Sequence, residues 1–161
     1  TTPQDFSGWQ GATFESSRGG RATYHGPSQI IIYPLVDLRK SRANWRERDV
    51  HAYLRGLENA TVDALKDLGL SHAEARTTES QGLSLTGVWV GEKKIASIGI
   101  AVRKWITYHG VAINILNDAQ AFYGINPCGF HRDVMTSMES ELGRADINEA
   151  KKICQSIFSR W

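Results

Sequence analysis

The chain has 161 residues, 41% of them hydrophobic, and a formal net charge of +2, which fits a single domain over residues 1–161 with a sizeable core. Its basic residues form no run of the kind that follows a phosphate backbone, so the composition disfavours a nucleic-acid partner. No apolar stretch approaches the roughly 20 residues of a membrane helix, and the start TTPQDFSGWQ lacks a signal-peptide pattern. These two observations predict a protein without membrane association. We expect it in the cytoplasm or the mitochondrial matrix.

The first 70 residues predict a glycine-rich loop, a buried strand and a long helix. The loop RGGRATYHGP, residues 18–27, is rich in glycine as phosphate-binding turns are, but it contains neither G-x-x-x-x-G-K-[ST] nor G-x-G-x-x-G. A nucleotide site therefore has weak support. The β-branched run at residues 29–38 predicts the strand. Apolar residues at steps of three and four over residues 44–68, followed by Gly69, predict the helix and its end.

The middle of the chain changes to strand periodicity. Residues 87–102 contain two strand-like runs joined at Gly91-Glu92-Lys93, which is a short hairpin connection. Residues 105–115 continue with β-branched and aromatic side chains. We therefore predict three or more antiparallel strands in this part of the chain.

The C-terminal third returns to helix. Thr136 and Glu139 form a T-x-x-E capping box, and Gly143 is placed to end that helix. Asp146 and Glu149 start a second helix, whose apolar face comprises Ile147, Ala150, Ile153, Cys154, Ile157 and Phe158. Strands that cluster between helices without βαβ alternation favour an α+β fold.

The two cysteines differ in their surroundings. Cys154 lies on the apolar face of the last predicted helix, where a free cysteine behaves as a small buried hydrophobe, so we interpret it as structural. Cys128 lies in the turn INPCGF ahead of a capped helix, near backbone donors, and is the better nucleophile candidate. A reactive thiolate needs a neighbouring cation or base. The candidate partners are Lys93, Lys94, His25, His109 and His131.

Spacing alone does not choose among these partners. Strand alternation predicts that Lys94 shares a face with Ala96, Ile98 and Ile100, and that Lys93 points with Ile95, Ser97 and Gly99. His25 and His109 each occur in the tetrapeptide Thr-Tyr-His-Gly, and the glycine after each histidine permits close approach of backbone or ligand.

Four segments together resemble the lipoyl(octanoyl) transferase family, the octanoyl-carrier-protein to protein N-octanoyltransferases. They are RGGRATYHGPSQIIIYPLVDL, GVWVGEKKIASIGIAV, WITYHGVAINI and INPCGFHRDVMTS, in the family's order and spacing. The resemblance implies the α+β catalytic domain shared with lipoate and biotin protein ligases, in which helices pack around a larger and a smaller β-sheet.

The resemblance also implies roles for particular residues. Cys128 would be the acyl-thioester nucleophile, and Lys94 would lower its pKa and then handle protons. One wall of an acyl pocket would be Arg18, Gly19, Gly20, Arg21, Ala22, Thr23, Tyr24 and His25. The remaining lining would be Ser97, Ile98, Gly99, Gly110, Val111 and Ala112. Backbone N–H groups at Gly99 and Gly129 are suitable donors to the reaction's oxyanion.

The reaction implied moves an octanoyl group from acyl carrier protein to Cys128 and then to a lysine ε-amine. The acceptors would be lipoyl domains of 2-oxoacid dehydrogenase complexes and the glycine cleavage H protein. A thioester is already activated, so the transfer requires no ATP, metal or other cofactor, and covalent catalysis divides it into two steps.

The sequence departs from the family's pattern at two places. Ser28 stands where the family's loop has the second glycine of HGPGQ, and only residues 1–17 precede the RGG motif, where family members carry a few dozen more.

Three alternatives stay open at this point. They are an ATP-dependent lipoate or biotin ligase of the same fold, a non-catalytic acyl or carrier-protein binding module, and a cysteine hydrolase. A ligase would form an adenylate and would not need Cys128. A hydrolase would need a histidine with an orienting Asn or Asp, a set that the sequence does not suggest.

Overall fold

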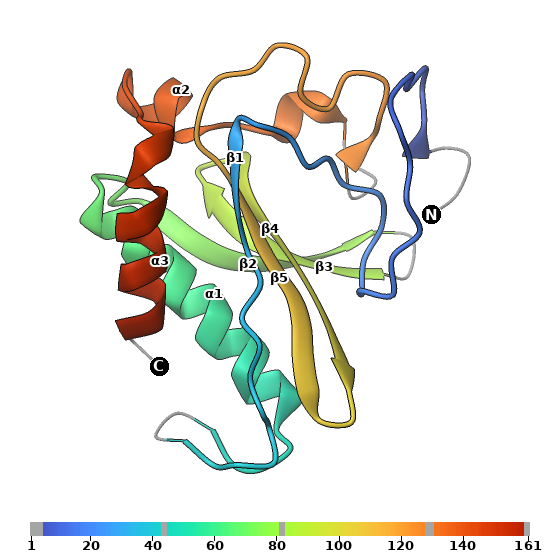
Figure 1. The fold of residues 1–161 in the computed structure, drawn as a ribbon. Helices are drawn as coiled ribbons and strands as arrows, with labels where there is room; N and C mark the ends of the chain where they lie inside the picture. The colour runs from blue at the N-terminus through green and yellow to red at the C-terminus, as the bar shows by residue number, and fades with distance from the viewer. Residues whose placement is uncertain (1–4, 43–44, 81–82, 128–130, 160–161) are drawn as a thin grey trace.

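A five-stranded antiparallel sheet with the order β1-β5-β4-β3-β2 organises the protein (Figure 1). The structure, a computed structural model, describes residues 5–42, 45–80, 83–127 and 131–159. Helices pack on this sheet, which confirms the predicted α+β class. The elements in chain order are β1 (Gln29–Ile32), α1 (Val50–Asp67), β2 (Ala73–Ser80), β3 (Leu83–Val90), β4 (Lys93–Arg103), β5 (Ile106–Asn114), η3 (Arg132–Val134), α2 (Met138–Leu142), η4 (Ile147–Glu149) and α3 (Ala150–Ser159).

Helices α1 and α3 lie side by side and close one face of the sheet, which we call the helix-covered face (Figure 1). Aliphatic side chains from the sheet and from both helices form one continuous core there, and burial of such side chains is the main force that holds the helices on the sheet. These side chains include Ile98, Val111 and Ile113 from the sheet, Leu57 and Leu65 from α1, and Ile153 and Ile157 from α3. The helix-covered face is therefore the structural core.

Residues 5–27 cover the opposite face of the sheet, which we call the loop-covered face. The Gly19 N–H donates to the Ile100 carbonyl at 3.1 Å, so the loop follows β4. Phe6 pairs with Ile125 from the segment after β5, which joins two parts of the covering. Figure 1 shows both segments, in blue and orange, on the side of the sheet away from α1 and α3.

A β-bulge in β4 reverses the predicted orientation of Lys94. Val88 pairs with Ala96 but the next residue, Trp89, pairs with Lys94, so Ile95 is an extra residue in β4. Ile95 and Ala96 both lie in the helix-covered core. The extra residue shifts the alternation of side chains along β4 by one position. Lys94 therefore lies on the loop-covered face with Ser97, and not on the helix-covered face with Ala96. The prediction from simple alternation was wrong because the extra residue cannot be recognised without the pairing strand.

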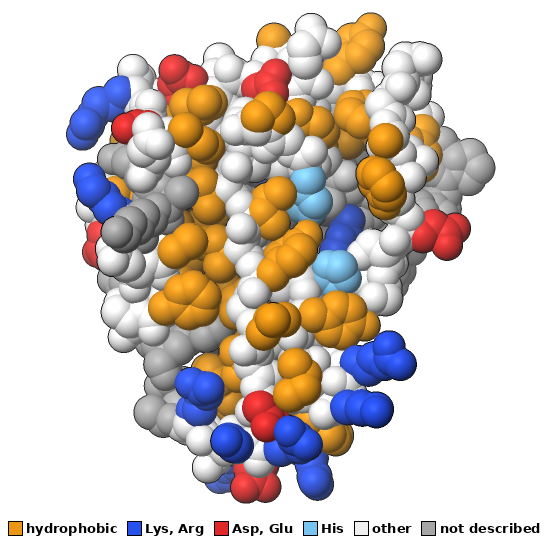
Figure 2. Space-filling model, viewed as in Figure 1, with side chains coloured by type: hydrophobic (Ala, Val, Ile, Leu, Met, Phe, Trp, Pro, Cys, Tyr) orange, Lys and Arg blue, Asp and Glu red, His pale blue; other side chains and the backbone are white. Residues whose placement is uncertain are grey.

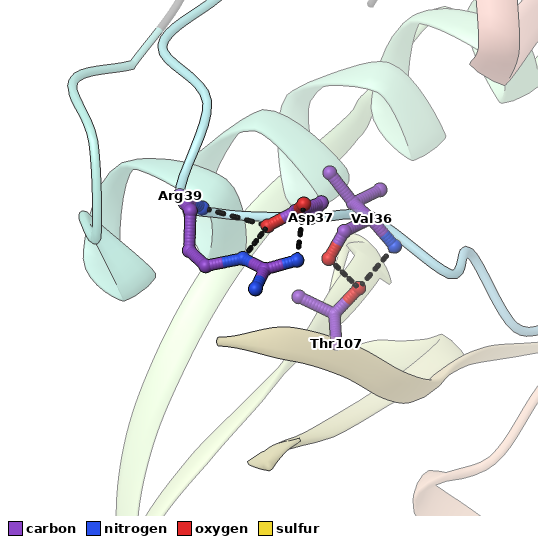
Figure 3. A network of polar contacts seen from close by, with 4 residues as sticks. All are labelled: Val36, Asp37, Arg39 and Thr107. Carbon is purple, nitrogen blue, oxygen red and sulfur yellow. Dashed lines mark hydrogen bonds and ion pairs between the residues drawn. The ribbon is translucent and has the colours of Figure 1, made fainter. Parts of the chain in front are cut away.

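The chain after β1 leaves the sheet but stays fastened to β5. The predicted strand over residues 29–38 ends at Ile32. Proline has no N–H to give a strand ladder, and the ladder is interrupted at Pro34. Beyond it, the Thr107 N–H donates to the Val36 carbonyl at 3.0 Å and the Leu38 N–H donates to the Trp105 carbonyl at 2.8 Å, and the Thr107 side chain adds further bonds. Thr107 is fully buried; its Oγ1 accepts from the Val36 N–H at 2.9 Å and donates to the Pro34 carbonyl at 2.8 Å. Figure 3 shows the contacts of Thr107 with Val36 beside the ion pair of Asp37 and Arg39.

The predicted helices are confirmed, with changes at their ends. The first helix begins at Val50 and not near residue 44, because the Asp49 side chain accepts from the Ala52 N–H at 2.8 Å and forms the N-cap. The cap of α2 is Ser137, which accepts from the Ser140 N–H at 3.2 Å, so the predicted Thr136 cap was one residue early. Gly143 ends α2 in the left-handed conformation, as predicted.

Two features of the sheet differ from expectation. Strand β2 was not predicted, because its sequence AEARTTES is polar and has no apolar strand pattern. It is a strand because it pairs with β3 along its whole length. The smaller second sheet is absent among the described residues, which form one sheet and isolated bridges. Within the same ranges, no helix combines the length and the hydropathy that crossing a bilayer requires.

Candidate active site

The RGG loop lies directly on β4 because the strand has a glycine beneath it. A Cβ added at Gly99 would lie 3.0 Å from both the Gly19 carbonyl oxygen and Arg18 Cδ, which is tighter than ordinary packing. Gly20 adopts φ +92°, a conformation that other residues rarely take. The glycines of this loop and strand therefore allow two stretches of backbone to approach, and no phosphate is needed to explain them.

The middle of the loop faces inward and is anchored by polar and aromatic contacts. Arg21 forms an ion pair with Asp5 at 2.6 Å, with the two side chains only 3% and 0% exposed. The Tyr24 ring packs on Trp9 and Phe122 at centroid distances of 6.0 and 5.3 Å. Ala22 is buried. Arg21, Ala22 and Tyr24 line a wider groove of about 1040 Å³ beneath residues 6–17 and do not line the cavity described next.

A cavity of about 140 Å³ opens between the loop and strands β4 and β5. Residues from each of the three segments implied by the resemblance line it: Arg18, Gly19, Gly20, Thr23 and His25 from the loop, Ser97, Ile98 and Gly99 from β4, and Gly110, Val111 and Ala112 from β5. Its size is close to the roughly 150 Å³ of an engineered protein cavity that takes up benzene. The cavity can therefore admit a small apolar group.

The same cavity has lining residues that sequence reasoning missed: Tyr33, Leu54, Thr86 and Ile100. Leu54 was assigned to the core face of α1, and Tyr33 to a buried strand, so neither gave a signal. His109 also lines the cavity. The repeated Thr-Tyr-His-Gly tetrapeptide was the available signal for it, since the second copy supplies His109 and Gly110.

Tyr33 connects the two histidines of the repeated tetrapeptide. Its ring meets the His109 ring edge-on at 5.4 Å, and its hydroxyl lies 3.5 Å from His25 Nε2. Burial lowers the pKa of His25, and the nearby Arg18 charge lowers it further, against a hydrogen bond to Gln29 that raises it. Figure 2 shows histidine side chains among hydrophobic ones near the middle of this face, and basic side chains at its lower end.

Lys94 belongs to β4, as Ser97, Ile98 and Gly99 do, but it does not line the cavity. Its side chain is 0% exposed, which is unusual for lysine. Its backbone carbonyl accepts from the Thr136 N–H at 3.0 Å. Lys93, in contrast, is exposed and donates to the Asp133 carbonyl. The two lysines that spacing could not separate therefore have different environments.

Cys128 and Gly129 lie outside the described residues, and the structure places neither. The chain on both sides of them is fixed. The Asn126 N–H donates to the Asp5 carbonyl at 2.9 Å, and Met135 pairs with Lys94 itself. The other thiol, Cys154, is half-buried against the core, and burial raises its pKa, which agrees with a structural role. In the same described ranges, no three His, Cys, Asp or Glu side chains gather as a metal site would require.

The fold is similar to that of ligases that attach lipoate and biotin. A lipoate-protein ligase A bound with ATP matches 89% of this chain and 56% of its own, with a TM-score of 0.61 and 22% identity. A biotin protein ligase from Aquifex aeolicus matches 83% of this chain and 51% of its own, with a TM-score of 0.54 and 14% identity. Likeness at these identities establishes the fold alone.

Sequence relatives are closer. The model of the lipoyl protein ligase A/B catalytic domain matches residues 10–159. An octanoyltransferase of Bdellovibrio bacteriovorus is 44% identical over 94% of this chain and 72% of its own length. Those of Solibacter usitatus and Pyrobaculum calidifontis, the latter described as probable, are 43% and 45% identical, and the chain spans 62% and 59% of their lengths. The chain therefore belongs to the lipoyl protein ligase A/B catalytic domain family, and within it to the octanoyltransferases.

Proposed function

We propose that this chain transfers an octanoyl group from a carrier thioester through Cys128 to a lysine ε-amine. The observation that carries the proposal is the cavity of about 140 Å³ between the RGG loop and strands β4 and β5, with the buried Lys94 on β4. Ile98, Val111 and Leu54 give it aliphatic surface for an acyl chain, and its glycines leave the strand backbone open to a ligand. The octanoyltransferase relatives support the same activity.

In the first step, the Cys128 thiolate attacks the carbonyl carbon of the donor thioester. The bond between that carbon and the donor sulfur breaks, and the carrier leaves as a thiolate that takes up a proton from the ammonium beside Cys128, which becomes a neutral amine. An ammonium beside Cys128 would favour its thiolate form. We assign that ammonium to Lys94 and not to Lys93, because Lys93 is exposed and turned to the Asp133 carbonyl.

In the second step, the acceptor amine attacks the Cys128 thioester. A carbon–nitrogen bond forms, the carbon–sulfur bond breaks, and the proton lost by the amine passes to Lys94 or to the leaving thiolate. A buried lysine gives up its proton more readily than a solvated one, so it can serve as a base once the thiolate is consumed. The amide product is more stable than a thioester, which makes this step the downhill one.

The donor we propose is octanoyl-acyl carrier protein, and the acceptors are lipoyl domains of 2-oxoacid dehydrogenase complexes and the glycine cleavage H protein. The compartment would be the cytoplasm, or the mitochondrial matrix in a eukaryote. The substrate-binding set is Arg18 to His25, Ser97 to Gly99 and Gly110 to Ala112, of which Arg21, Ala22 and Tyr24 act by holding the loop.

Mass spectrometry after incubation with octanoyl-acyl carrier protein tests the proposal. We expect one added octanoyl group that hydroxylamine removes, and its transfer to a lipoyl domain without ATP. Cys128→Ala should abolish both signals, because it removes the nucleophile. The matched control is Cys154→Ala, which removes the other thiol and should keep both. An acyl group that persists in Cys128→Ala, or product that forms from free octanoate only with ATP, would contradict the mechanism.

A further inference from the structure

The side chain of Lys94 crosses β3 at a glycine. Gly87 pairs with Ser97, so it lies on the loop-covered face, beside the lysine that the bulge turns to this face. A Cβ added at Gly87 would overlap Lys94 Cε and would lie 3.1 Å from Lys94 Nζ and 2.5 Å from the Ala96 carbonyl oxygen. Any side chain at position 87 therefore competes with the lysine for the same space.

Two residues further along β3, an indole ring bounds the lysine. Trp89 is the residue that pairs with Lys94 across the bulge, and Lys94 Nζ lies 5.9 Å from the centroid of its ring. This is within the range in which an aromatic face attracts an ammonium. Trp89 is itself buried. Gly87 provides room for the stem of the lysine, and Trp89 provides a surface for its charged end.

Two other basic residues lie near this site. Arg76 of β2 lies over the same Trp89 ring at 5.8 Å, so it adds positive charge there. Lys93 extends to the Asp133 carbonyl, and Asp133 pairs with His131 at 3.0 Å. The contacts of the Lys94 side chain with Gly87 and Trp89 both come from β3.

We propose that Gly87 and Trp89 are positioning residues for Lys94: they hold its ammonium on the loop-covered face at the place from which it acts on the reacting thiol. This inference rests on the role of Lys94 given above. Neither residue needs to touch the substrate. The bulge at Ile95 determines the face of the sheet on which the Lys94 side chain lies. The absence of a side chain at Gly87 leaves space for its methylene groups, and the ring of Trp89 holds its ammonium.

The pH dependence of iodoacetamide labelling of Cys128 gives the apparent pKa of its thiol. That pKa depends on how close the Lys94 ammonium lies to the thiol. All variants carry Cys154→Ala, so Cys128 is the only thiol. Lys94→Ala should raise the apparent thiol pKa by about one to three units, the size of the effect of a nearby opposite charge. Gly87→Ala should raise the apparent thiol pKa by about one unit or more in the presence of Lys94. In the Lys94→Ala background, Gly87→Ala should cause no further rise in this pKa.

Thermal unfolding of the same four proteins separates position from folding. Gly87→Ala should lower the melting temperature less in the Lys94→Ala background, where its Cβ no longer meets Cε. If Gly87→Ala folds only in that background, the competition for space is direct and the proposal holds. If it lowers stability equally in both, or folds in neither, the Ala96 carbonyl accounts for the glycine and the proposal fails.

Gly91→Ala is the matched glycine control. Gly91 lies in the β3–β4 turn with φ +56° and has nothing within 4 Å of an added Cβ. Its substitution strains the same hairpin without reaching Lys94, so it should reduce stability and leave the labelling profile unchanged. A shift in Gly91→Ala equal to that in Gly87→Ala would assign the effect to the hairpin and overturn the proposal.

Trp89→Leu and Trp89→Phe test the ring. We expect Leu to raise the apparent thiol pKa and Phe to restore most of the original value, because Phe retains an aromatic face. Equal profiles for Leu and Phe would remove Trp89 from this role. If Lys94→Ala itself leaves the labelling profile unchanged, the function proposed for Lys94 fails; if it shifts the profile and neither Gly87→Ala nor Trp89→Leu does, only the positioning inference fails.

Discussion

The two faces of the sheet differ in the size and polarity of their side chains. The helix-covered face is filled with aliphatic side chains such as Ile98 and Ile113, which pack against α1 and α3. The loop-covered face presents Gly87, Ser97 and Gly99 to a loop that touches the strand through backbone groups. A face made of large apolar side chains gains stability by excluding water. A face made of glycine and small polar residues gives up some of that gain and leaves room for a lysine and a ligand.

Strand β4 therefore contributes both to the core and to the loop-covered face. The bulge at Ile95 determines which of its residues lie on each face. If the residues of β4 simply alternated between the two faces, Lys94 would point with Ala96 into the aliphatic core against α1 and α3. Because of the bulge, Ile95 lies in the core together with Ala96, and Lys94 lies on the loop-covered face. Three experiments test this difference between the two faces.

The largest effect on stability should come from breaking the buried ion pair that anchors the loop. Arg21→Met removes the ion-pair partner of the buried Asp5 carboxylate, which should cost about 3–5 kcal/mol. Urea denaturation measures this. The double variant Arg21→Met with Asp5→Leu should recover much of the loss, because it removes both charges together. If the single variant costs less than about 1 kcal/mol, polar anchoring does not hold the loop-covered face.

The next effect should come from a cavity in the opposite face. Ile113 is 0% exposed and lies in the helix-covered core, so Ile113→Ala should cost about 2–5 kcal/mol. Ser97→Ala, on the neighbouring strand but on the loop-covered face, should cost less than about 1 kcal/mol. The two variants are compared by the denaturant midpoint. Equal losses would show that the faces do not differ in the way the packing suggests.

The smallest effect should be a pH dependence from His25. Its pKa is lowered in the folded protein by burial first and by Arg18 next. Between that lowered pKa and about 6.5, the unfolded chain binds a proton at His25 that the folded chain does not. Stability should therefore fall as the pH falls through this window, and His25→Gln should flatten the curve. We expect less than about 1 kcal/mol, because part of the ring is exposed and solvent screens the charges.

Residue patterns predicted much of the scaffold. The 3.6-residue periodicity of α1 and α3 and the run of strands from residue 87 to residue 115 correspond to elements of the structure. The loop, β4 and β5 segments named for the pocket do line one cavity, apart from Arg21, Ala22 and Tyr24. Patterns failed where a partner decides the outcome: β2 is polar and becomes a strand by pairing with β3, and Tyr33 reaches the cavity because the chain turns away after Ile32.

Neighbours along the chain are enough to predict the chemical groups and the local elements: two thiols in different settings, adjacent lysines after a turn, a glycine loop and helices with one apolar face. The burial of Lys94 on the loop-covered face, with Lys93 exposed to solvent, depends instead on contacts between distant parts of the chain. The physical reason is that strand orientation is set by pairing: a single unpaired residue, Ile95, reverses every side chain before it, and nothing in the letters of β4 alone marks that residue.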